Sequence, residues 1–304
     1  MKSNAVTVSG RSRRLVMREN VSAYLFMLPF LLFFVLFVLY PMVMCVYTSF
    51  FDATMGDRAD IFVGLANYTE LFHDPVFWKA MRNTFVIVVV SVPVTCIFSL
   101  WVANVISKMH VAATSVFRCI FYLPVVTGSV AVTMVWKWMY NNYYGILNYV
   151  GTSTGILDQP IDWLADSRFA LACIIVILLT TSVGQPIVLY VSALDNVDKT
   201  LVEAAEVDGA TKGQVFRHIK WPQMMPTTLY ILVITTINSF QCFALIQLLT
   251  KGGPNNETMT IMYYIFHHAF NLYRYGYGNA MGVVLAIIIG ILSAIQFKLG
   301  QSKS

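Results

Sequence analysis

Asn83–Ser107 reads NTFVIVVVSVPVTCIFSLWVANVIS and contains no charged residue. A helix rises about 1.5 Å per residue, so a run of this length can cross the roughly 30 Å hydrocarbon core of a bilayer. The run is predominantly apolar along its whole length, whereas a strand of a membrane barrel would alternate between apolar and polar residues. This stretch therefore predicts a transmembrane helix.

Other uncharged runs in the chain are also long enough to cross a bilayer, because each has about 18 residues or more. They are Val21–Phe51, Cys119–Trp136, Phe169–Leu194, Trp221–Thr250 and Tyr275–Phe297. The composition agrees: 58% of the residues are hydrophobic and only 12% are charged, whereas soluble domains average about 25% charged residues. We therefore predict an all-α polytopic membrane protein with six transmembrane helices, and we exclude a disordered chain.

The distribution of Lys and Arg predicts the orientation, because cytoplasmic loops carry an excess of these residues. Most of the 20 Lys and Arg residues fall on one side if the N-terminal tail is cytoplasmic. We therefore expect both termini in the cytoplasm, a basic tail over residues 1–20 that contacts membrane lipid, and one transmembrane domain over residues 21–304. This placement at membrane boundaries explains the net charge of +5 without a nucleic-acid partner.

Sequence motifs for catalysis or cofactor binding are missing. The dipeptide Gly-Lys does not occur, which excludes a P-loop for ATP. His267 and His268 are adjacent, so on a helix they would point about 100° apart and could not share a metal ion. Gly151–Gly155 matches G-x-S-x-G, but it follows a membrane helix in an external loop, and we interpret it as a turn. We expect neither an enzyme nor a cofactor or metal site.

The loop of residues 195–222 carries more local order than a connector requires. Thr200 and Glu203 fit a T-x-x-E capping box, so a helix is expected to begin at Thr200. Gly209 can adopt positive φ and is expected to end that helix. The loop would then form a short helical hairpin that projects from the membrane.

The second half of the loop contains another possible capping box, Thr211 with Gln214, and Pro222 is expected to end the second helix at the membrane. Physical reasoning leaves two interpretations open here. The hairpin could fit a groove on a soluble partner, or it could be a solvated connector between two membrane helices.

The same loop resembles the EAA signature of the permease subunits of binding-protein-dependent ABC importers, which reads E-A-A, three residues, G, nine residues, I-x-L-P. The matching residues are Glu203, Ala204, Ala205, Gly209, Ile219 and Pro222. Trp221 stands where Leu is usual. Leu249–Pro254, Tyr263–Ile265, Leu28-Pro29 and Tyr40-Pro41 further resemble the maltose-type sugar permeases.

The resemblance implies the type I ABC importer permease fold, in the plasma or inner membrane. It implies that the hairpin is a coupling helix-turn-helix that docks in a cleft of a cytoplasmic ATPase, with Glu203 facing a basic group and Gly209 allowing the turn. It also implies the partners: a second permease subunit, two copies of the ATPase, which binds the ATP, and an extracytoplasmic solute-binding protein. The function implied is translocation of a sugar or oligosaccharide.

Uncharged polar residues near the midpoints of two runs suggest a substrate pathway. Thr181 and Gln185 are spaced i, i+4 and would share a helix face, followed by Pro186, which can kink the helix. Thr235, Asn238 and Gln241 follow at i, i+3, i+6. Such side chains suit the hydroxyl groups of a sugar, although they could equally form hydrogen bonds between helices.

Other functions stay open from the sequence. An ABC permease could carry another neutral solute, such as a polyol, or a glycerol-phosphate-type solute. An ion-coupled secondary transporter would need no ATPase, but no acidic or basic residue lies inside the six runs, and such carriers usually use one.

Overall fold

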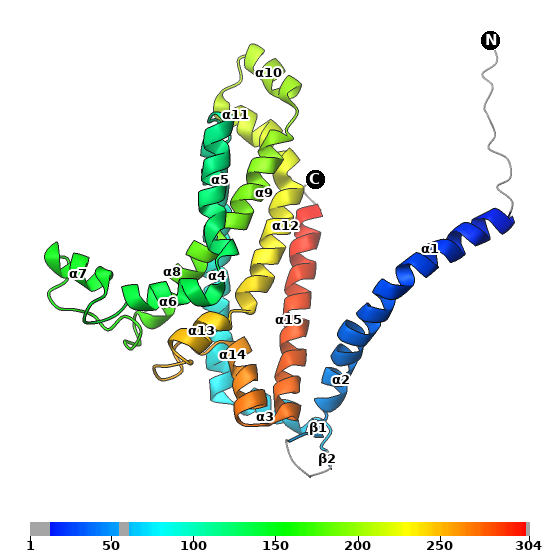
Figure 1. The fold of residues 1–304 in the computed structure, drawn as a ribbon, viewed down its shortest axis with the longest axis vertical. Coiled ribbons are helices and arrows are strands. Elements are labelled where there is room, and N and C mark those ends of the chain that lie inside the picture. The colour runs from blue at the N-terminus through cyan, green and yellow to red at the C-terminus, as the bar shows by residue number, and fades with distance from the viewer. Residues whose placement is uncertain (1–12, 55–60, 302–304) are drawn as a thin grey trace.

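The computed structural model describes residues 13–54 and 61–301. Almost all of the described secondary structure is helical; the exceptions are a short antiparallel pair, β1 (Phe51–Asp52) and β2 (Ile61–Phe62), and an isolated bridge between Thr54 and Arg274. Figure 1 shows a bundle of long helices with one helical arm standing apart from it. The predicted all-α class is therefore confirmed.

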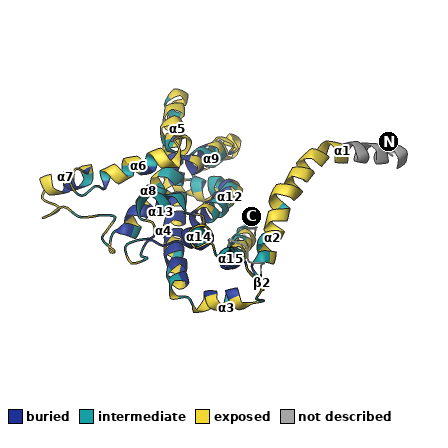
Figure 2. Cartoon of the chain, turned by 60° about the horizontal axis from the view of Figure 1, so that its bottom comes forward, coloured by how far each residue is buried: buried dark blue, intermediate teal, exposed yellow. Residues whose placement is uncertain are grey.

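The arm comprises α1 (Arg13–Phe34), a π-helical segment (Val35–Leu39) and α2 (Tyr40–Thr48). Its candidate membrane span, Tyr24–Thr48, has none of its residues buried within the chain. Within the described arm, α2 makes the main contacts with the rest of the chain, at α15 and β1 (Figure 2). α1 begins inside the predicted tail of residues 1–20, and residues 1–12 lie outside the described residues.

Long helices form three further candidate spans. They are α4 (Pro75–Ile106), a unit over Lys212–Leu249 that is interrupted at residues 241–243, and α15 (Tyr275–Gln301). The unit comprises α11 (Lys212–Val215), a π-helical segment (Phe216–Lys220), α12 (Trp221–Phe240) and α13 (Ala244–Leu249). α4 lies at the centre and contacts helices from both halves of the chain, among them α8, α9 and α12.

The remaining two spans are broken. α5 (Val111–Val126) meets α6 (Ser129–Met139) at 92°, and α8 (Ala170–Ser182) meets α9 (Gly184–Asp195) at 41°. By length and composition, four described helices can cross a membrane, or up to six if each bent pair counts as one span.

The third predicted span is therefore wrong as a single straight helix. Gly128 has an extended backbone (φ −50°, ψ 139°), which interrupts the hydrogen-bond ladder between α5 and α6. Pro124 is not the cause of the break, because α5 continues through it to Val126 and the Thr127 N–H still donates to the Leu123 carbonyl.

Short helices complete the chain: α3 (Ala66–His73), α7 (Ile146–Ser153), α10 (Lys199–Val207) and α14 (Ile261–Phe266), which continues as a π-helical segment (His267–Asn271). In Figure 1 the hairpin of α10 and α11 lies at the same end as the C-terminal end of α15. β1, β2 and α3 lie at the opposite end.

Asp74 ties several elements together at that opposite end. Its carboxylate caps α4 by accepting from the Val76 N–H, and it also accepts from the hydroxyls of Tyr264 (2.5 Å) and Tyr277 (2.9 Å). Burial opposes ionisation of Asp74, but these hydrogen bonds outweigh it and hold its pKa below the usual value. We call Asp74, Tyr264 and Tyr277 the Asp74 clamp; it joins α4, α14 and α15.

Candidate functional site

The projecting hairpin is capped two residues earlier than its sequence suggested. Asp198, not Thr200, caps α10: its carboxylate accepts from the Thr200 N–H at 2.9 Å and the Thr200 hydroxyl at 2.7 Å. The Thr200 side chain lowers the pKa of Asp198. The predicted Thr200–Glu203 capping box is therefore wrong, because the carboxylate competes better for the free amides and positive end of the helix.

The predicted role of Gly209 as the residue that ends α10 is confirmed. Its φ is +83°, a conformation in which a side chain is strained. The Ala210 N–H donates to the Ala205 carbonyl at 2.9 Å, and the Gly209 N–H donates to the Glu206 carbonyl at 3.1 Å. These two bonds are the Schellman pattern, which satisfies the last carbonyls of the helix and turns the chain back.

The second predicted capping box is also confirmed. The Thr211 hydroxyl accepts from the Gln214 N–H, and the Gln214 side chain accepts from the Thr211 N–H at 2.7 Å. Pro222, in contrast, does not end the helix as predicted. The π-helical segment over Phe216–Lys220 widens the turn before it, and Pro222 sits in the first turn of α12, where a missing amide hydrogen is tolerated.

The matched signature residues lie on different faces of the hairpin. Ala205, Gly209 and Ile219 line one recess of about 360 Å³. Glu203 lines a second recess, of about 600 Å³, between the hairpin and the loop from α4 to α5. Ala204 and Pro222 are exposed. The hairpin therefore has a recess on each of two sides.

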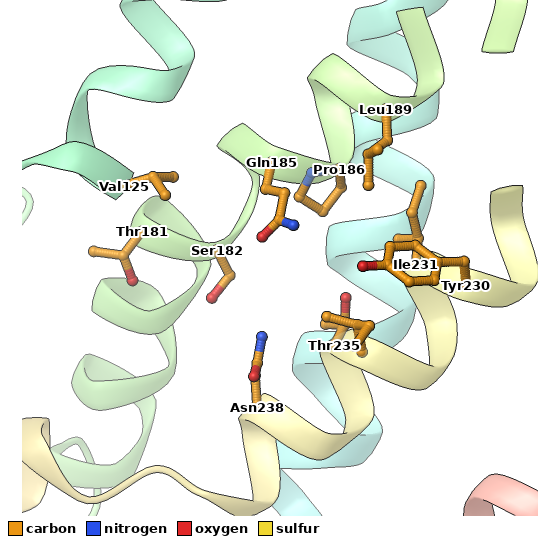
Figure 3. A pocket seen from close by; sticks show the side chains of 11 residues that line it. Val125, Thr181, Ser182, Gln185, Pro186, Leu189, Tyr230, Ile231, Thr235 and Asn238 are labelled. Carbon is orange, nitrogen blue, oxygen red and sulfur yellow. The ribbon is translucent and has the colours of Figure 1, made fainter. Parts of the chain in front are cut away.

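A cavity of about 170 Å³ lies where the α8–α9 bend faces α12. Four of the five predicted pathway residues line it: Thr181, Gln185, Thr235 and Asn238. Figure 3 shows Gln185 and Ser182 directed into the cavity from one wall and Asn238 from the other.

The geometry behind this meeting differs from the predicted one. Thr181 belongs to α8 and Gln185 to α9, so the two are not on one continuous helix face. The helix breaks at Val183, and Pro186 in the next turn cannot donate to the Ser182 carbonyl. The predicted kink is confirmed, and the bend, not the i, i+4 spacing, places both side chains at the cavity.

The cavity residues differ in what they can offer a ligand. In the described part of the chain, the Gln185 and Asn238 amides make no hydrogen bond to protein, so their donors and acceptors are free. The Thr181 hydroxyl donates to its own helix, to the carbonyls of Ile177 and Leu178. Thr235 is 6% exposed. The two amides are therefore the main free polar groups.

Gln241 lies just beyond α12 and lines a second recess, of about 290 Å³, which shares Thr181 and Asn238 with the first cavity. The predicted stripe of Thr235, Asn238 and Gln241 therefore serves two adjoining spaces. Among the described residues, those that line either space carry no charge. The described residues also include no group of three or more potential metal ligands.

Sequence reasoning missed several lining residues. Tyr230 is the aromatic side chain of the first cavity, and Val125 of α5 lines both spaces. Tyr230, Ile234 and Asn238 follow at i, i+4, i+8, a spacing that could have identified Tyr230 from the sequence. Val125 carries no such signal, because it comes from a helix distant in the chain.

Comparison with known proteins gives consistent matches. The family described as "Binding-protein-dependent transport system inner membrane component" matches residues 8–299. The probable ABC transporter permease protein YesP of Bacillus subtilis is 32% identical, over 98% of this chain and 96% of its own. The lactose transport system permease protein LacF of Rhizobium radiobacter is 30% identical, over 91% of this chain and 93% of its own.

A solved structure shares the fold. The crystal structure of a bacterial ABC transporter involved in the import of the acidic polysaccharide alginate contains a chain that superposes with a TM-score of 0.81. The two chains are 21% identical, and the match covers 94% of this chain and 97% of the other.

Proposed function

Because the chain belongs to the family of binding-protein-dependent transport system inner membrane components, we propose that it carries a sugar or oligosaccharide across the membrane. It is a multi-pass inner-membrane permease component of an ABC importer that works with a binding protein, and it is not itself an enzyme. The solute-binding protein delivers the sugar from outside the membrane.

The observation that carries the sugar proposal is the uncharged polar cavity. Free amides of Gln185 and Asn238 face each other across it, and Tyr230 offers an aromatic ring. Neutral donors and acceptors match sugar hydroxyls, and an aromatic face can pack against a sugar ring. Relatives such as LacF and the multiple sugar-binding transport system permease protein MsmF of Streptococcus mutans, 32% identical, support the same substrate class.

The hairpin of α10 and α11 is the proposed coupling element. Its caps and Schellman turn make it a folded unit, and its two recesses could receive side chains of an ATPase surface. Two copies of a cytoplasmic ATPase would supply the energy, with Glu203, Ala204, Ala205, Gly209, Ile219 and Pro222 at or beside the contact. The hairpin then defines the cytoplasmic side, with both termini on that side.

A second permease subunit completes the proposed assembly. The arm of α1 and α2 has an apolar span that its own bundle leaves uncovered, as expected for a helix that packs on another subunit or faces lipid. Residues 21–304 act in this proposal as one transmembrane domain, with residues 195–222 as its coupling loop.

Uptake measurements test the proposal. Cells that express the complete importer should accumulate a labelled uncharged oligosaccharide, and deletion of the ATPase should abolish this uptake. An ATPase variant that cannot hydrolyse ATP is the matched control and should give the same loss. Uptake that persists without the ATPase would identify an ion-coupled carrier, and uptake of polyols or glycerol phosphodiesters alone would refute the sugar assignment.

A further inference from the structure

α6 and α7 expose large apolar side chains, although each helix also packs an apolar side chain against the bundle, Trp136 on α6 and Leu147 on α7. Thr133 of α6 is fully buried, and Asn148 of α7 is 3% exposed. In a water-exposed helix the apolar side would face the protein. Large apolar side chains on the outer side as well as on the inner side are typical of a helix in contact with lipid.

Asn148 is the structural centre of this region. Its amide nitrogen donates to the carbonyls of Asn142 (3.2 Å) and Ile161 (2.8 Å). Its amide oxygen accepts from the Ile161 N–H (3.1 Å) and the Trp163 indole N–H (2.9 Å). α7 is therefore held at a fixed rotation about its axis, and its outward side is determined by the fold.

The outward side includes large apolar and aromatic side chains, and the exposed Thr152 and Ser153 follow in the last turn of α7. On α7 the apolar and aromatic side chains are Ile146, Tyr149 and Val150, at i, i+3, i+4, and Tyr149 is 72% exposed. On α6 they are Val135 and Trp138. We call these five residues the α6–α7 face. Lys137 is also exposed on α6, and its long side chain can reach lipid phosphates from an apolar surface.

The α6–α7 face continues the apolar exterior of α5, a helix of the third span. Ile120, Leu123 and Val126 of α5 are exposed, as is Val130 in the first turn of α6. The 92° bend makes α6 run along the membrane if α5 crosses it. In Figures 1 and 2, α6 and α7 project sideways from the bundle.

We propose that the α6–α7 face lies in the membrane at the boundary between headgroups and acyl chains. Trp and Tyr are the side chains enriched at this boundary, and the five residues of the face carry no charge, which suits lipid better than water. The contact anchors the elbow between α5 and α6. Thr127 and Ser129 of that elbow line the second substrate recess, so the anchor holds one wall of the pathway at a fixed depth.

Spin labels on the assembled importer test the proposal. A single cysteine replaces Tyr149 (Tyr149→Cys) in a chain without its five native cysteines, in vesicles of phosphatidylcholine and phosphatidylglycerol. Collision rates are measured with oxygen, which concentrates in lipid, and with a nickel chelate, which stays in water. Asp158→Cys is the matched control, since Asp158 is exposed in the loop after α7.

The label at position 149 should show a several-fold higher ratio of oxygen to nickel collisions than the label at position 158. Frequent nickel collisions at 149 would place the face in water, and low rates for both reagents would place it against another protein; either result overturns the proposal. If the cysteine-free chain does not assemble, a second experiment uses a photoreactive carbene precursor that dissolves in the membrane and labels the side chains exposed to lipid. In the unmodified importer it should label residues 143–150 and spare residues 157–166, and the reverse pattern would refute the lipid contact.

Discussion

At the residue scale, the fold separates polar side chains that have partners from those that are free. Ser239 of α12 hydrogen-bonds to Ser91 of α4 at 2.9 Å, and it is buried. Asn238, its neighbour in the chain, points into the cavity without a protein partner in the described structure. Adjacent residues thus serve packing and the proposed pathway respectively.

Replacing Asn238 with leucine should therefore weaken transport without unfolding the protein. Loss of a hydrogen bond is worth about 0.5–1.5 kcal/mol, so the rate of sugar uptake at low concentration should fall about twofold to tenfold. Thr228→Val is the matched control on α12, because Thr228 lines neither cavity; its hydroxyl donates to the Met224 carbonyl and interacts with Tyr190. Unchanged uptake and selectivity in Asn238→Leu would make Asn238 a lipid or packing residue.

At the element scale, the hairpin owes its shape to local hydrogen bonds. Asp198 starts α10, Gly209 ends it, and Thr211 with Gln214 starts α11. Each bond joins residues only a few positions apart, so the hairpin can fold with little support from the bundle. This independence suits the proposed contact with the surface of an ATPase.

Gly209→Ala tests the hairpin. An added Cβ would meet nothing within 4 Å, so the effect arises from the positive φ alone, a strain of roughly 1–2 kcal/mol. We expect the importer to assemble but to lose much of the coupling between ATP hydrolysis and uptake, measured as sugar moved per ATP hydrolysed in vesicles.

Gly213→Ala is the paired control. Gly213 lies inside α11, has equal open space and no positive φ, so alanine should preserve coupling. Equal coupling in both variants would show that the Gly209 turn does not transmit force.

At the scale of the whole molecule, the two ends of the bundle are built differently. The end with the hairpin depends on local caps, whereas the opposite end depends on the Asp74 clamp, which joins residues that are distant in the chain. Arg274 and Glu70 add an ion pair beside the clamp at 2.7 Å. The opposite end should therefore respond to pH through these long-range contacts.

The lowered pKa of Asp74 gives the sign of that response. A carboxyl group with a lower pKa in the folded state stabilises the fold above its unfolded pKa, and this contribution disappears as pH falls through the folded value. The melting temperature of the purified complex should thus fall on acidification, and Asp74→Asn should flatten the part of the curve below about pH 4. The same slope in both proteins would assign the acid sensitivity to other groups.

The extent of prediction from sequence differs between these scales. The membrane spans of α4 and α15 follow from uncharged length, and Gly209 and the Thr211–Gln214 cap follow from short-range spacing. The sequence did not identify Asp198 as the cap of α10, because Asp198 and Thr200 are both capping residue types and lie only two positions apart. The break between α5 and α6 was missed because an apolar run can continue through a sharp bend.

The sequence by itself determined the class of fold, the family signature and the turn of the hairpin, because hydrophobic length and capping depend on residues that are close together in the chain. Only the tertiary structure decided where Gln185 meets Asn238. The bend beside Gly184 lies against the Phe121 carbonyl, which an added Cβ would approach to 2.3 Å. A cavity between such helices depends on contacts between segments that are distant in the chain, and the spacing of neighbouring residues cannot predict those contacts.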